Sequence, residues 1–144
     1  MSKYHQGQFK PNHPEKYRGD STQIFYRSSY ELKLMLRFDN DKNIIEWNSE
    51  ETVIPYISPI DGKYHRYFVD FRVKTSTGDT ILIEVKPASK LKQPVKPKKV
   101  TKRFLKEVME WGVNDAKFKA AKEYCADRNW KFIIFTEKEL GISS

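Results

Sequence analysis

Two segments of the chain alternate apolar and polar residues as β-strands do, yet each carries an acidic residue inside the pattern. Residues 64–73 (YHRYFVDFRV) hold Asp70 at such a position. Residues 80–86 (TILIEVK) hold Glu84 on the same face as Lys86. A charge buried in a sheet costs free energy unless it pairs with an opposite charge or binds a metal ion. The two segments therefore predict a sheet in which these charges converge.

Length and charge limit the class of protein. At 144 residues the chain is long enough for one domain with a real core. It has no apolar run of membrane-spanning length, and its single cysteine, Cys125, cannot form an intramolecular disulfide, so we expect an intracellular protein without a membrane partner. A net charge of +8 indicates a polyanionic partner, and charge alone does not separate nucleic acid from an anionic membrane surface.

The pattern of apolar residues predicts an α/β domain with a mixed β-sheet. Helices are expected at 28–38, 100–111 and 114–127, and strands at 43–47, 52–57, 64–73, 80–86 and 131–136. The first four strands are predicted to form an antiparallel meander, and the last strand to run parallel to a neighbour. Asn114 is predicted to cap the third helix, whose inner face would carry Phe118, Ala121 and Cys125. Residues 1–24 predict an arm with little regular structure before a single domain at 25–144.

Asp70 and Glu84 are the first candidates for chemistry. Mg²⁺ prefers one or two carboxylates together with waters and phosphate oxygens, and the main-chain carbonyl of Val85 could add a ligand. Lys86 could orient or deprotonate an attacking water, or stabilise charge that develops on a phosphate. The alternative is that Glu84 and Lys86 form a surface pair at the edge of the sheet. The spacing alone leaves both interpretations open.

Glu31 is a further acidic candidate. Its neighbours three, four and seven residues onward are Leu34, Met35 and Phe38, which places it on or beside an apolar helix face. The sequence Ser28-Ser29-Tyr30-Glu31 also spells a capping box, in which Glu31 would bond only the main-chain amide of Ser28. Both roles stay open on the pattern alone.

A basic segment follows the second acidic strand. Between Lys86 and Lys106 there are nine Lys or Arg residues and no Asp or Glu. Such a run favours sequence-independent contact with the phosphates of double-stranded DNA, and the alternative is a solvated linker. The predicted DNA-binding residues are Lys90, Lys92, Lys96, Lys98, Lys99, Lys102 and Arg103, and Lys10, Lys16 and Arg18 of the arm could add to them.

Several ordered motifs resemble a known family. The motifs are residues 26–31 (YRSSYE), 66–71 (RYFVDF), 83–87 (IEVKP), 114–118 (NDAKF) and 130–140 (WKFIIFTEKEL). Together they resemble the TnsA-type branch of the restriction-endonuclease-like nucleases. With the arm motif at 9–20 (FKPNHPEKYRGD), the whole chain resembles the head completion nucleases of phages with contractile tails. One departure is Val69, which stands where the family often has proline before the aspartate.

The resemblance implies a restriction-endonuclease-like core in the order α-β-β-β-α-β, with residues 25–144 as the nuclease domain. It implies a deoxyribonuclease that uses Mg²⁺, with Mn²⁺ as a substitute, and leaves open whether an exonuclease activity accompanies the endonuclease. Glu31, Asp70 and Glu84 would be the acidic site, and Lys86 the catalytic lysine. The protein would trim packaged DNA at the portal when filled heads join tails, in the cytoplasm of the infected bacterium or at the head–neck of the virion. The alternatives are a non-catalytic DNA-binding component of the head neck and a TnsA-type transposon-end endonuclease subunit.

Overall fold

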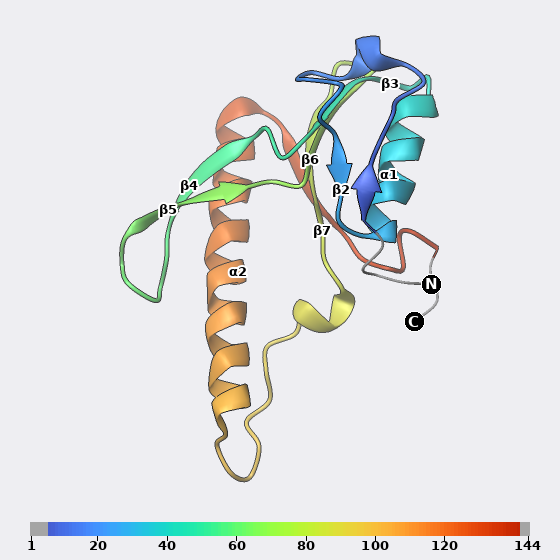
Figure 1. Cartoon of the computed structure of the whole chain (residues 1–144). Coiled ribbons are helices and arrows are strands. Elements are labelled where there is room, and N and C mark those ends of the chain that lie inside the picture. The colour runs from blue at the N-terminus through green and yellow to red at the C-terminus, as the bar shows by residue number, and fades with distance from the viewer. Residues whose placement is uncertain (1–5, 142–144) are drawn as a thin grey trace.

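A mixed four-stranded sheet forms the centre of the domain. The computed structural model describes residues 6–141 (Figure 1). The strand order is β3 (Ile44–Ser49), β6 (Phe71–Thr75), β7 (Thr80–Val85) and β8 (Lys131–Phe135). The strands β3, β6 and β7 are antiparallel, whereas β8 runs parallel to β7, as predicted. The α/β class with a mixed sheet and flanking helices is therefore confirmed.

The helices α1 (Ser29–Asn40) and α2 (Lys102–Arg128) cover opposite faces of this sheet. On one face, Ile83 of β7 packs in a buried cluster with Leu34 and Phe38 of α1, which we call the α1-side core. On the other face, Leu82 packs with Ala121 and Cys125 of α2, the α2-side core. Both faces of β7 are thus buried, which explains its nearly continuous apolar sequence. Neither helix among the described residues combines the length and apolarity needed to cross a membrane.

The segment predicted as one strand at 64–73 is two strands in different sheets. Its first part, β5 (Tyr64–Phe68), pairs with β4 (Val53–Ile57) in a separate two-stranded hairpin. Its second part is β6, which pairs with β3 and β7. The chain changes sheet at Val69, whose amide donates to Thr52, and at Asp70, whose carbonyl accepts from Glu50. The predicted meander is therefore wrong, because β3 lies beside β6 and not beside β4.

The two helices predicted at 100–111 and 114–127 are one helix, α2. Thr101 caps its start by accepting a hydrogen bond from the amide of Phe104 at 3.1 Å. Asn114 lies inside the helix and caps nothing, so that prediction is wrong. Gly112 lies in the interior of α2, at a cost of about 1 kcal/mol relative to alanine, and the helix continues through it. The predicted inner face of Phe118, Ala121 and Cys125 is confirmed.

The described part of the predicted arm, residues 6–24, packs onto the α1-side core. It contains little regular structure, as expected: β1 (Gly7–Gln8) pairs with β2 (Phe25–Tyr26), and η1 (Pro14–Lys16) is a short 3-10 helix. Its first five residues lie outside the described part of the chain. Phe9 and Tyr17 are buried, with ring centroids 5.8 and 4.8 Å from that of Trp47. The arm thus adds apolar residues to the core, a role that its polar composition did not predict.

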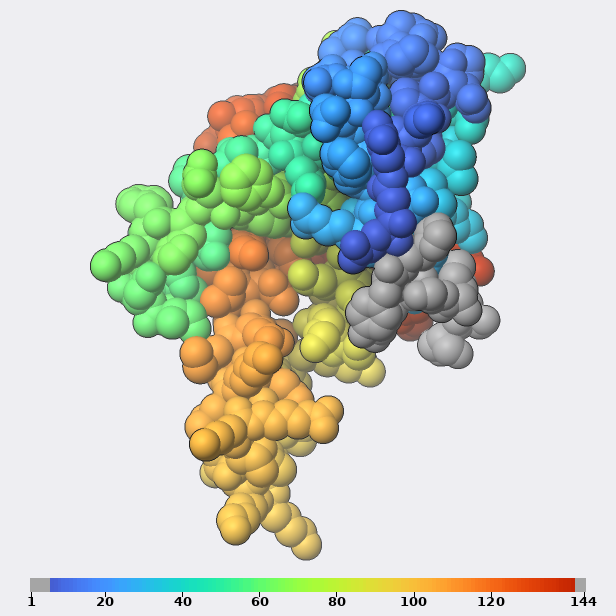
Figure 2. Space-filling view, in the orientation of Figure 1, coloured from blue at the N-terminus to red at the C-terminus, as the bar shows by residue number. Residues whose placement is uncertain are grey.

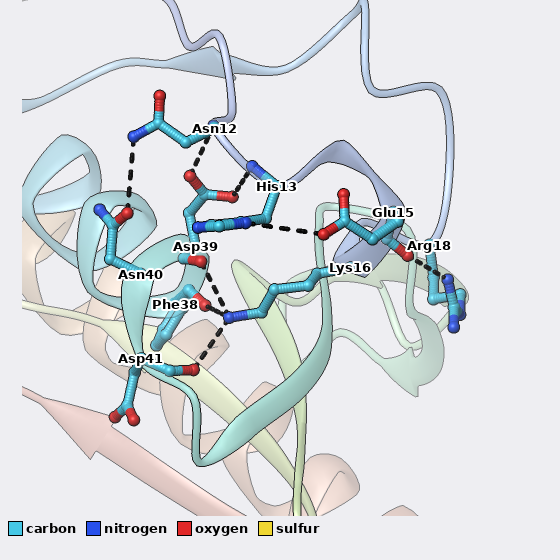
Figure 3. A network of polar contacts seen from close by, with 9 residues as sticks. All are labelled: Asn12, His13, Glu15, Lys16, Arg18, Phe38, Asp39, Asn40 and Asp41. Carbon is cyan, nitrogen blue, oxygen red and sulfur yellow. Dashed lines mark hydrogen bonds and ion pairs between the residues drawn. The ribbon is translucent and has the colours of Figure 1, made fainter.

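Lys16 binds the C-terminal end of α1 (Figure 3). Its ammonium donates hydrogen bonds to the main-chain oxygens of Phe38 at 2.6 Å, Asp39 at 2.9 Å and Asp41 at 2.9 Å. These carbonyls are among those that an α-helix leaves unpaired at its end. An ammonium has three N–H donors, so none is left for a DNA phosphate. The interpretation of Lys16 as a DNA contact is therefore wrong.

We expect Lys16→Met to lower the free energy of unfolding by about 1–2 kcal/mol, because the helix end loses three hydrogen bonds and a favourable charge. Urea denaturation followed by circular dichroism measures this change. Lys10→Met is the control, since Lys10 is exposed in the same arm. Equal stabilities of the two variants would contradict the capping role.

Candidate active site

Asp70 and Glu84 lie side by side where the β4–β5 hairpin joins the main sheet. Phe71 of β6 pairs with Ile83 of β7, and the same antiparallel register places Asp70 opposite Glu84. Asp70 accepts a hydrogen bond on Oδ2 from the amide of Val85 at 2.8 Å, which fixes its carboxylate against β7. The convergence expected from the two acidic segments is therefore present.

Glu84 is buried on the central strand β7, with 6% of its surface exposed. Its Oε1 accepts a hydrogen bond from the hydroxyl of Tyr67 at 2.7 Å, and its Oε2 lies 3.7 Å from the ammonium nitrogen of Lys86. Glu84 and Lys86 do form an ion pair. Because Glu84 is buried and β7 lies inside the sheet, the alternative of a surface pair at the edge of the sheet is wrong. Burial and the charge of Glu84 raise the pKa of Tyr67, so this phenol stays protonated and keeps donating.

The two carboxylates line the same pocket, and burial acts on the charge of each. Burial and the charge of Glu84 raise the pKa of Asp70 well above its ordinary value, while the Val85 amide and Lys86 act in the opposite direction. Two like charges at close range in such a pocket favour a cation between them. The donor set, two carboxylates on neighbouring strands, therefore fits a divalent metal ion.

Glu31 is engaged at the start of α1. Its amide donates to the Ser28 hydroxyl at 3.1 Å, and its carboxylate accepts from the Ser28 hydroxyl at 3.3 Å and from the Arg27 amide at 3.4 Å. Ser28 thus caps the helix as the capping box predicts, but the predicted bond from the Ser28 amide to Glu31 is wrong, because the main-chain donor is Arg27. Burial chiefly raises the pKa of Glu31, and its charge in turn raises that of Asp70.

Glu31 does not complete a three-carboxylate cluster in this structure. Between residues 6 and 141, no three Asp, Glu, His or Cys side chains are placed so that they could hold one metal ion. The structure thus assembles Asp70 and Glu84 as a pair beside Lys86. Metal binding by Glu31 and by the carbonyl of Val85 stays a prediction.

Lys117 of α2 is a member of the site that the sequence analysis missed. A pocket of about 600 Å³ is lined by Arg27, Glu50, Arg66, Tyr67, Phe68, Asp70, Glu84 and Lys117. The ammonium of Lys117 lies 5.5 Å from the ring centroid of Tyr67 and 5.7 Å from that of Tyr56. Burial and the nearby charge of Lys86 lower its pKa. The available signal was its position four residues before Ala121, which puts a charge on the predicted inner face of the helix.

The basic segment, residues 86–106, projects away from the central sheet (Figure 1). The residues predicted to contact DNA lie in the loop after β7, which includes the 3-10 helix η2 (Ala88–Lys90), and in the first turn of α2 (Figures 1 and 2). All of them are exposed. Arg103 pairs with Glu107 at 3.1 Å, so α2 brings an acidic residue against one of these charges. Arg18 of the arm is likewise paired with Glu46 at 3.0 Å. Contact of the segment with DNA stays a prediction.

Comparisons with known proteins show the family of the chain. The family model described as TnsA-like endonuclease N terminal matches residues 41–137 of the chain. The head completion nuclease of Enterobacteria phage T4 is 42% identical over 138 residues, which cover 93% of this chain and 92% of that protein. The matched range includes Asp70, Glu84, Lys86 and Lys117. The chain therefore belongs to the head completion nuclease family, within the TnsA-like branch of the restriction-endonuclease-like nucleases.

Proposed function

We propose that the chain is a metal-dependent deoxyribonuclease that hydrolyses phosphodiester bonds during phage head completion. The observation that carries the proposal is one pocket lined by two converging carboxylates, Asp70 and Glu84, and by Lys117, with Lys86 paired to Glu84 beside it. The relative's name, head completion nuclease, supports both the reaction and the stage of assembly. We place the protein in the cytoplasm of the infected bacterium and at the head–tail connection, where it would trim packaged DNA beside portal or neck proteins.

Mg²⁺, with Mn²⁺ as a substitute, is the metal that this donor set suits. Asp70 and Glu84 would hold it, with the Val85 carbonyl and Glu31 as further candidate ligands. A divalent ion in such a site polarises a phosphate oxygen and lowers the pKa of a bound water. Hard oxygen donors of this kind select Mg²⁺ and Mn²⁺ over metals that prefer nitrogen and sulfur ligands.

Tyr67, Lys86 and the basic segment have separate roles in the proposed reaction. Tyr67 holds one oxygen of Glu84, which fixes the orientation of that carboxylate in the pocket. Lys86 lies beside the other oxygen of Glu84, where its ammonium can orient the attacking water or stabilise charge on the phosphate. The basic segment that starts at Lys86 would hold the DNA duplex through phosphate contacts.

Lys117 is suited to bind a phosphate oxygen of the DNA strand. Its ammonium is half-buried, and within residues 6–141 it forms neither an ion pair nor a hydrogen bond with a protein group. The two tyrosine rings stabilise this cation only in part, and an anionic ligand in the pocket would supply the ion pair that it lacks.

We expect Lys117→Met to lower the single-turnover cleavage rate about tenfold to hundredfold, because a charge that contacts the phosphate is lost. Lys117→Arg should recover part of this rate. The matched control is Lys122→Met, since Lys122 is exposed on the same helix. Equal rates for the two methionine variants would contradict a role of Lys117 in the site.

Plasmid cleavage tests the proposed function. The wild-type protein should nick or linearise supercoiled DNA in Mg²⁺ or Mn²⁺ and should be inactive in EDTA, whereas Glu84→Gln should be inactive throughout. A plasmid substrate detects endonuclease activity, and a linear substrate labelled at its ends detects exonuclease activity. Equal cleavage by wild type and Glu84→Gln would refute the proposal. A protein that binds DNA without cutting it would instead be a structural component of the head neck.

A further inference from the structure

The β4–β5 hairpin has one apolar face that no described part of the chain covers. Its inner face packs on α2 through Ile54, Tyr56 and Tyr67. Figures 1 and 2 show the hairpin extending sideways from the domain, in green. The pairing register places the following side chains together on the outer face: Val53 with Phe68, Pro55 with Arg66, and Ile57 with Tyr64. Tyr64 is 75% exposed, Ile57 52% and Phe68 45%. An exposed apolar face of this kind indicates a binding surface.

The outer face of β5 carries a row of three planar side chains. Tyr64, Arg66 and Phe68 occupy every second position of one strand, so all three point to the same side. The row is about 13 Å long at the usual rise of a β-strand. The guanidinium carbon of Arg66 lies 5.5 Å from the ring centroid of Phe68. Aromatic rings and guanidinium planes are the groups on which proteins stack nucleic-acid bases.

This row begins at the acidic pocket. Arg66 and Phe68 line the same pocket as Asp70 and Glu84. Phe68 and Asp70 are two residues apart, so their Cα atoms are within about 7 Å of each other. Phe68 is therefore within reach of the base next to a phosphate at the carboxylates, and the following bases could lie along β5 towards Tyr64.

Only unpaired bases could stack on this face. Inside a duplex both faces of a base are covered by its neighbours, so a planar side chain can stack only on a base that has left the helix. A protein partner would account for the apolar side chains and for Arg66, but it would not account for the continuity of the row with the acidic pocket.

We propose that the outer face of the β4–β5 hairpin binds unpaired bases next to the phosphate that is cut. The inference rests on the proposed nuclease function and names its substrate class: DNA with a single-stranded or frayed segment, its duplex part held by the basic segment.

Binding measured in EDTA tests the inference without cleavage. The probes are a fluorescent single strand and a blunt DNA hairpin that contains the same sequence. The variants are Tyr64→Leu and Phe68→Leu, which remove a ring but keep an apolar side chain. The control is Ile57→Ala, which removes apolar surface from the same face without removing a planar group.

We expect each leucine variant to weaken binding of the single strand about tenfold, since base–aromatic stacking is lost. The affinity for the blunt hairpin should change less than about twofold, as expected for phosphate contacts alone. Unchanged single-strand binding in both leucine variants would overturn the inference and assign the face to a protein partner. An equal loss on the blunt hairpin would overturn it as well, because the face would then contact DNA without regard to base pairing.

Wild-type cleavage of plasmid DNA, measured in parallel, separates this result from the proposed function. If the wild type cuts DNA and the leucine variants bind like the control, only the inference about unpaired bases fails. If the wild type does not cut DNA in Mg²⁺ or Mn²⁺, the nuclease function fails, whatever the binding results.

Discussion

Asp70→Asn is expected to abolish DNA cleavage and to raise the thermal stability of the protein at the same time. The loss of cleavage should be at least about a thousandfold, because the site loses one of its two charged metal ligands. Asparagine keeps an oxygen that can accept the hydrogen bond from Val85, so the local structure should persist. The gain in stability follows from removing a buried charge that lies against Glu84.

The pH dependence of stability checks the cause of this gain. The folded state raises the pKa of Asp70, so above the ordinary carboxylate pKa the folded protein binds more protons at this group than the unfolded chain does. The contribution of Asp70 to stability is therefore full below that ordinary pKa and declines as the pH rises towards the raised value. The melting temperatures of the two proteins should converge near pH 4 and diverge above it.

Calorimetry in EDTA measures this difference, and each kcal/mol corresponds to about 3 °C for a domain of this size. The control is Asp127→Asn, since Asp127 is exposed on α2. A lower melting temperature for Asp70→Asn than for the control at pH 8 would contradict the account of two repelling carboxylates in the pocket.

Lys86→Met is expected to lower the cleavage rate about a hundredfold to a thousandfold and to reduce stability. The variant removes the ammonium that lies 3.7 Å from Oε2 of Glu84. Two carboxylates then remain in the pocket without that cation, which should cost about 1–3 kcal/mol at neutral pH. Affinity for DNA should change little, because one phosphate contact among many is lost.

The opposite signs on stability distinguish the roles of the two residues. Both variants should cleave DNA far more slowly than the wild type, but Asp70→Asn should melt above the wild type and Lys86→Met below it. Lys90→Met is the control for the general loss of a positive charge, because Lys90 is exposed in the basic segment. Cleavage by Lys86→Met at the rate of Lys90→Met would rule out Lys86 as a catalytic residue.

The sequence predicted the acidic strand β7 correctly, because its period and its flanking residues agree. Its length, its end at Pro87 and the placement of Glu84 beside Lys86 all follow from the local pattern. Its parallel neighbour β8 was predictable too, since a helix connects the two strands. These features depend on residues that are neighbours in the sequence, so the sequence alone is enough to predict them.

The change of sheet at Asp70 could not be predicted in this way. Tyr67, Val69, Phe71 and Val73 alternate without interruption, and this pattern indicates one strand with one buried face. In the structure Tyr67 and Val69 belong to the α2-side core, whereas Phe71 and Val73 belong to the α1-side core. The alternation continues because both cores are apolar. The alternation of apolar residues does not show that they pack in two different cores. Asp70 lies at this crossing point, which brings it to Glu84.

The positions of Tyr67 and Lys117 in the site depend on tertiary packing. Tyr67 reads as an apolar core residue in the sequence, and its bond to Glu84 exists only because β5 leaves the main sheet. Lys117 lies 31 residues after Lys86 in the chain and reaches the pocket only because α2 packs on the β4–β5 hairpin. Lys16 shows the reverse error, since a basic residue in a polar segment proved to be a structural cap.

Anomalous X-ray scattering from crystals soaked in Mn²⁺ tests the central claim most directly. The account predicts a peak between the carboxylates of Asp70 and Glu84, and its absence from crystals of Asp70→Asn. Wild-type crystals that show no peak in this pocket, grown from protein that cuts DNA in Mn²⁺, would contradict the account and place the chemistry elsewhere.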